Sequence, residues 1–120
     1  MDIPTLPASD PKLAENTLST ALAASDVVLD AIFGFSFKPP VRAPFDVALP
    51  LIAHAGLPIV SVDIPSGWDV ERGDAAPDAD AGKIGVPVLY PDVLVSLTGP
   101  KEGVRTFTGR HFLGGRFVPK

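Results

Sequence analysis

The 120-residue sequence contains no cysteine, which excludes disulfide bonds, thiolate metal sites and a thiol nucleophile. Its two histidines, His54 and His111, stand far apart without metal-ligand spacing, and we expect both to be structural. None of the glycine-rich phosphate-binding patterns of nucleotide-binding proteins is present. The candidate functional groups for binding or catalysis are therefore carboxylates, hydroxyls and amines.

Long basic and long apolar stretches are also missing. The net charge is −4, and no Lys/Arg stripe exists to neutralise consecutive phosphates, so nucleic acid is not an expected partner. No apolar run reaches the ~20 residues that a membrane-spanning helix requires. The first seven residues lack the basic and apolar regions of a signal peptide, so we expect a cytoplasmic or mitochondrial protein without a visible targeting segment.

Fourteen prolines and eleven glycines indicate a loop-rich fold rather than a helical bundle. Four segments have the composition of strands: 26–33, 58–64, 92–97 and, with a glycine bend, 111–118. Three segments are expected to be helical: 13–25, 44–55 and, as a short helix, 101–107. Pro50 should kink the second helix, and 69–91 has no clear period. This alternation predicts an open, doubly wound α/β sheet whose strands are covered on both faces.

Two of the predicted strands carry an aspartate near the carboxyl end, Asp30 and Asp63, and each is followed by a glycine-containing turn. In parallel sheets the carboxyl ends of the strands face one crevice, where ligands bind. Ser66 and a lysine, Lys38 or Lys101, should converge there as well. Either aspartate alone is as well explained as a loop brace, but the repetition at two strand ends favours a site for a cation or for acid–base chemistry.

Four spaced segments of the sequence carry a resemblance to one family: 30–38, 63–70, 97–101 and 107–119. Together they resemble NAD(P)H-hydrate epimerase, the YjeF N-terminal domain family, also known as apolipoprotein A-I-binding protein. The resemblance implies a Rossmann-like three-layer sandwich with a mostly parallel sheet. It implies interconversion of the R and S forms of hydrated NADH and NADPH, one potassium ion, a homodimer and an apolipoprotein-type protein partner.

The resemblance also assigns roles to individual residues. Asp30 and Ser66 match potassium ligands, whereas Asp63 and Lys38 match catalytic positions. The residues that match the substrate-binding set are Gly34, Phe35, Ser36, Phe37, Lys38, Pro39, Pro40 and Asp63.

The sequence departs from the family pattern at three places. The family's Asn-Asn-Gly-Gly-Asp-Gly loop is absent, so we interpret residues 1–120 as a partial domain, its C-terminal portion. Pro39 stands where glycine is usual, and 75–91 is longer than the corresponding loop. Two alternatives follow: a non-catalytic nucleotide- or protein-binding module, or a fragment whose exposed sheet edge associates with itself.

Overall fold

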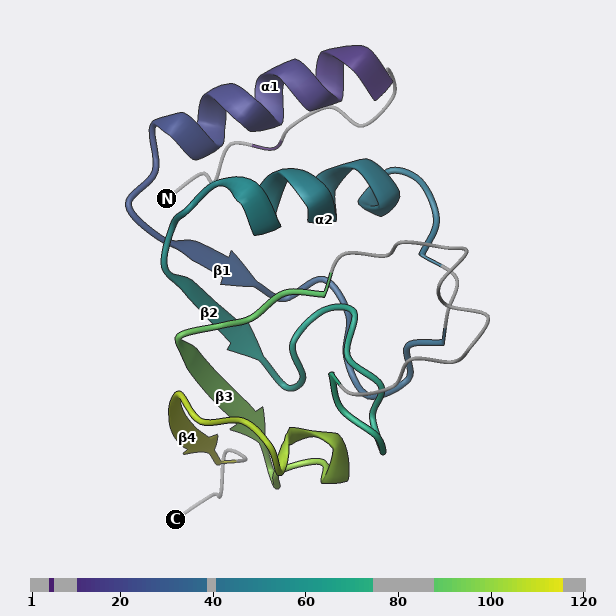
Figure 1. Cartoon of the computed structure of the whole chain (residues 1–120), viewed down its shortest axis with the longest axis vertical. Helices are drawn as coiled ribbons and strands as arrows, with labels where there is room; N and C mark the ends of the chain where they lie inside the picture. The colour runs from purple at the N-terminus through teal and green to yellow at the C-terminus, as the bar shows by residue number, and fades with distance from the viewer. Residues whose placement is uncertain (1–4, 6–10, 39–40, 75–87, 116–120) are drawn as a thin grey trace.

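The computed structural model of the chain describes Thr5 and residues 11–38, 41–74 and 88–115 (Figure 1). Its helices are α1 (Pro11–Ala23), α2 (Phe45–His54) and the short 3₁₀ helix η2 (Glu102–Val104). Its strands are β1 (Val28–Asp30), β2 (Ile59–Val62), β3 (Val93–Leu97) and β4 (Arg110–Gly114).

The four strands form one sheet in the order β1-β2-β3-β4, and every neighbouring pair is parallel. Helices α1 and α2 lie side by side near β1, while η2 and β4 lie at the opposite end of the sheet (Figure 1). The α/β class with a parallel sheet is therefore confirmed. Because the strands are parallel, β1, β2 and β3 all end on the same edge.

One face of the sheet is covered by α2. Leu49 and Ile52 of this helix form a core cluster with Ile59 of β2 and with Leu89. A second core cluster surrounds the indole of Trp68.

The register places a second row of apolar side chains on the opposite face: Leu29, Val60, Val62, Val93, Val95, Leu97 and Phe112. Leu29 is 68% exposed and Phe112 is 56% exposed. Within the ranges that the structure describes, the prediction that both faces are covered is therefore wrong at these two positions on the outer strands.

Two strands end earlier than predicted, and hydrogen bonding explains why. β1 stops at Asp30 because the next amides turn to side chains: Ile32 N–H donates to the Asp30 carboxylate (3.4 Å) and Phe33 N–H to Ser66 Oγ (3.3 Å). β2 stops at Val62 because Asp63 takes a positive φ of 73°, which no strand residue can adopt.

The helices fall close to the predicted ranges. Helix α1 was predicted over 13–25, and it begins and ends two residues earlier than that range. Helix α2 lies within the predicted 44–55. Pro50 is accommodated inside α2, although its ring nitrogen cannot donate a helical hydrogen bond. η2 is the short helix predicted within 101–107, and β4 is the last predicted strand, of which residues 116–118 lie outside the described ranges.

None of the helices in the described ranges is long and apolar enough to cross a membrane. The two histidines make local contacts, as expected. His54 Nδ1 lies 2.7 Å from the Pro50 carbonyl within α2, and His111 Nε2 lies 2.8 Å from Ser96 Oγ between β3 and β4.

A tight turn after Trp68 docks directly on η2. The Gly103 amide donates to the Val70 carbonyl at 2.8 Å, and a β-carbon at Gly103 would lie 2.2 Å from the Asp69 carbonyl oxygen. Because both groups are backbone, neither can move aside without shifting its segment.

We therefore expect Gly103→Ala to lower the free energy of unfolding by about 1–3 kcal/mol, the usual cost of overpacking. Urea denaturation measures this change. Gly115→Ala is the matched control, since a β-carbon there meets nothing within 4 Å, and it should change stability by less than about 0.5 kcal/mol. Equal stability of the Gly103 variant and the parent would contradict the close backbone contact.

Candidate functional site at the carboxyl ends of the strands

The carboxylate of Asp30 is buried at the end of β1 and is surrounded by donors. Ser66 donates to it twice, from Oγ (2.6 Å) and from its backbone amide (2.9 Å). Ser61 Oγ donates at 2.7 Å and the Ile32 amide at 3.4 Å. A carboxylate that is only 2% exposed is stable in this place because both oxygens are satisfied. Asp30 thereby joins the end of β1 to β2 and to the turn at Ser66.

Asp63 follows β2 in a strained backbone conformation. Its φ is 73°, and the Ile64 amide donates across it to the Val62 carbonyl at 3.0 Å. An i→i+2 bond around a residue with positive φ is the pattern of the rare, strained form of γ-turn. Aspartate tolerates the left-handed region better than most residues. Such strain persists only where the surroundings fix it, and it concentrates at functional sites.

The side chain of Asp63 is held from two other strand ends. Its Oδ2 accepts the Phe35 amide (3.1 Å), which belongs to the loop after β1. Its Oδ1 accepts a hydrogen bond from Lys101 Nζ, beyond the end of β3. A β-carbon at Gly34 would lie 3.3 Å from Oδ2, so glycine leaves just enough room for the carboxylate. The site is therefore a single carboxylate fixed by three loops.

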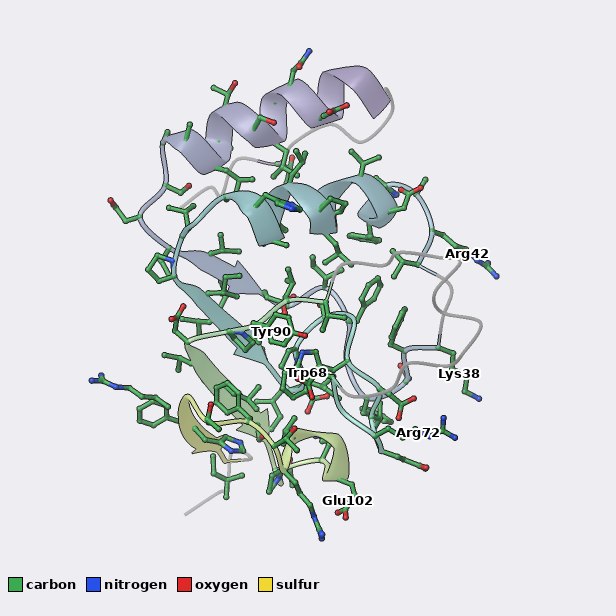
Figure 2. The ribbon with its side chains drawn as sticks, in the orientation of Figure 1. Lys38, Arg42, Trp68, Arg72, Tyr90 and Glu102 are labelled. Carbon is green, nitrogen blue, oxygen red and sulfur yellow. The ribbon has the colours of Figure 1, made fainter. Side chains whose placement is uncertain are left out.

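The two lysines considered from the sequence lie in different surroundings. The Lys101 side chain is 19% exposed beside an Asp63 side chain that is 11% exposed. Lys38 is exposed, and Figure 2 shows its side chain extending outward, away from the centrally placed Trp68. The structure thus brings Lys101 to Asp63, while Lys38 lies at the outer side of the same edge.

The loop after β1 presents its predicted substrate-binding residues in two ways. Phe37 is half-buried and stacks on Phe33, with ring centroids 4.2 Å apart. Phe35 is 68% exposed, so it is not part of the core, and Ser36 is exposed beside it. An exposed aromatic ring next to a fixed carboxylate is suited to stack on a planar ring of a ligand. Pro39 and Pro40 lie outside the described residues.

The end of β3 repeats the backbone pattern found at Asp63. Thr98 has a φ of 66°, and the Gly99 amide donates across it to the Leu97 carbonyl at 2.8 Å. Sequence reasoning missed this residue, because threonine gives no signal for positive φ and is β-branched, which makes the conformation costly. The adjacent glycine and proline indicated only that a turn follows the strand.

The turn after Trp68 carries the clearest electrostatic effect. The Asp69 carboxylate accepts the amides of Arg72 (2.8 Å) and Glu71 (2.9 Å), and these bonds lower the pKa of Asp69 below its usual value. Because the pKa of Asp69 is lower in the folded state, its hydrogen bonds stabilise the fold above the unfolded-state pKa. This stabilisation is lost as the pH falls through the folded-state pKa. The turn keeps Trp68 buried, with its Nε1 donating to the Leu89 carbonyl at 2.8 Å.

A parallel α/β sheet whose strand ends gather carboxylates, hydroxyl groups and an amine is the arrangement of Rossmann-like proteins that bind small molecules. The family described as YjeF-related protein N-terminus matches residues 2–103. The chain belongs to this family.

Several relatives of the chain carry one name. The chain is 56% identical over 110 residues to NAD(P)H-hydrate epimerase of Cryptococcus neoformans, covering 87% of this chain and 44% of the relative. The protein of the same name from Puccinia graminis is 54% identical, covering 84% of this chain and 38% of the relative. The one from Caenorhabditis elegans is 47% identical, covering 87% of this chain and 42% of the relative. The chain thus spans less than half the length of these relatives.

A solved structure agrees with the fold. The crystal structure of yeast ynu0 is 42% identical to the chain and superposes with a TM-score of 0.66, covering 80% of this chain and 38% of that one. The chain therefore shares its α/β fold with this solved structure.

The strain at Thr98 is testable by substitution. We expect Thr98→Gly to be more stable than Thr98→Ala by about 1 kcal/mol, because only glycine adopts positive φ without penalty. Chemical denaturation of the two variants measures the difference. Exposed Thr108, which is not at positive φ, is the matched control, and there alanine should be at least as stable as glycine. If the glycine variant were more stable than the alanine variant at both positions, or at neither, backbone strain at Thr98 would be contradicted.

Proposed function

We propose that the strand-end site acts on hydrated NADH and NADPH and interconverts their R and S forms. The observation that carries this proposal is the position of Asp63, a carboxylate fixed by the Phe35 amide and by Lys101 where parallel strands end. The names of the relatives support it.

Epimerisation requires a group that takes a proton in one step and returns it in another. The hydroxyl on the hydrated nicotinamide carbon must leave and return, or the ring must open and close, and in both cases no proton is gained or lost overall. A partly buried carboxylate beside the substrate suits this exchange. The exposed ring of Phe35 is placed to stack on the nicotinamide, and Lys38, at the outer side of the loop, is suited to meet a phosphate.

The proposal includes a potassium ion held by Asp30 and Ser66. Their oxygens are adjacent (2.6 Å) and buried, and hard oxygen donors suit such an ion. The described residues contain no group of three or more His, Cys, Asp or Glu that could hold a metal, so among these residues further ligands would be hydroxyl or carbonyl oxygens. When bound, the ion would supply a fixed positive charge between the loops after β1 and β2.

Three finer properties stay predictions: the homodimer and the apolipoprotein-type partner, which the resemblance implies, and the cytoplasmic or mitochondrial compartment.

Replacing Asp63 by asparagine tests the acid–base role. Asparagine keeps the shape and tolerates positive φ, so Asp63→Asn should fold, yet the rate of R–S interconversion should fall about 100-fold or more. Chromatographic separation of the two hydrate epimers measures this rate. Asp26→Asn, at an exposed aspartate before β1, is the control and should retain the parent rate. An active Asp63 variant would contradict the assignment.

The potassium proposal is tested by stability rather than activity. Exchange of NaCl for KCl at equal ionic strength should raise the melting temperature of the parent by a few degrees, because an ion that binds only the folded state stabilises it. Ser66→Ala should abolish this difference, whereas Ser19→Ala, on an exposed position of α1, should preserve it. Identical melting temperatures of the parent in the two salts would refute the site.

A further inference from the structure

Lys101 is connected to the end of β3 as well as to Asp63. Its Nζ donates to the carbonyl oxygens of Leu97 (3.2 Å) and Gly99 (3.4 Å), in addition to the Asp63 carboxylate. A lysine ammonium has three protons, so these acceptors use every donor that it has. The two carbonyls flank Thr98, and Lys101 therefore bridges the strained turn at Thr98 to the strained turn at Asp63.

This arrangement differs from that of a proton donor. A lysine that acts on the substrate directly needs an N–H directed toward it, and the three N–H groups of Lys101 are directed at protein oxygens. Its effect must therefore pass through Asp63. On the other side of the same carboxylate, the Phe35 amide and the space left by Gly34 define the position of Oδ2.

We propose that Lys101 is a positioning residue for the reaction: it fixes the Asp63 carboxylate by charge and by geometry, without itself touching the substrate. The proposal deepens the proposed function and rests on it. The chain folds Asp63 into a strained turn, and the partly buried ion pair to Lys101 keeps the carboxylate from rotating into other orientations. Lys101 thereby completes a frame whose opposite side is the loop after β1.

The first test compares Lys101→Met with Lys101→Arg in the epimer assay. Methionine keeps much of the length and loses the charge, so kcat should fall about 10- to 100-fold, as expected when a reacting group is misplaced, while KM changes less than about threefold. Arginine keeps the charge and should restore kcat to within about fivefold of the parent. Equal impairment of the two variants, or a methionine variant with parent kcat, would overturn the proposal.

Arg105→Gln is the control for removing a nearby positive charge. Arg105 pairs with Glu102 on η2, and its side chain is 76% exposed, so its loss should leave kcat unchanged.

A second readout separates this inference from the proposed function. Hydrogen exchange followed by NMR reports on the Phe35 amide, which is protected only while Asp63 Oδ2 accepts its bond. Lys101→Met should speed exchange at Phe35 about tenfold or more relative to the Asp92 amide, which donates to the Ile59 carbonyl far from the site. Arg105→Gln should leave this ratio unchanged.

The two measurements give distinct outcomes. An inactive parent chain would refute the proposed function, and the exchange ratio would then decide whether Lys101 positions Asp63. An unchanged ratio in Lys101→Met would overturn the inference whatever the activity of the parent.

Discussion

The buried carboxylate of Asp30 is the interaction on which the edge of the sheet depends. A charge in this position would be destabilising by several kcal/mol without partners, and its donors come from β2, from the turn at Ser66 and from the chain just after β1. Satisfying one group therefore fixes three segments at once. Ser66 in turn accepts the Phe33 amide, which sets the direction in which the loop after β1 leaves the sheet.

Asp30 and Asp63 have the same side chain but different roles in the structure. Asp30 is enclosed and accepts four hydrogen bonds, so it organises structure. Asp63 stands on a strained turn, and among the described residues its carboxylate accepts hydrogen bonds from one amide and one lysine, which leaves lone pairs for a ligand. The difference comes from the backbone, because the positive φ at Asp63 turns its side chain out of the strand direction toward the neighbouring loops.

Sequence patterns predicted the strands, the helices and the placement of Asp30 and Asp63 at neighbouring strand ends, since apolar runs and acids at their ends are local signals. The choice between Lys38 and Lys101 could not be made in this way, because it depends on the path of the chain after β3. The positive φ at Thr98 could not be predicted, because threonine does not favour this conformation. The strands that carry the exposed Leu29 and Phe112 have the same apolar composition as buried strands. These features are set by tertiary packing and by what covers the sheet.

We propose that the ends of β1, β2 and β3 together form one binding site for a hydrated nicotinamide dinucleotide. Its most direct test is an NMR titration of the isotope-labelled chain with hydrated NADPH in a potassium buffer. We expect the largest amide shift changes to fall on the loops at Phe35, Asp63 and Thr98, which lie far apart in sequence. An absence of shift changes, or changes confined to α1 and β4, would contradict it.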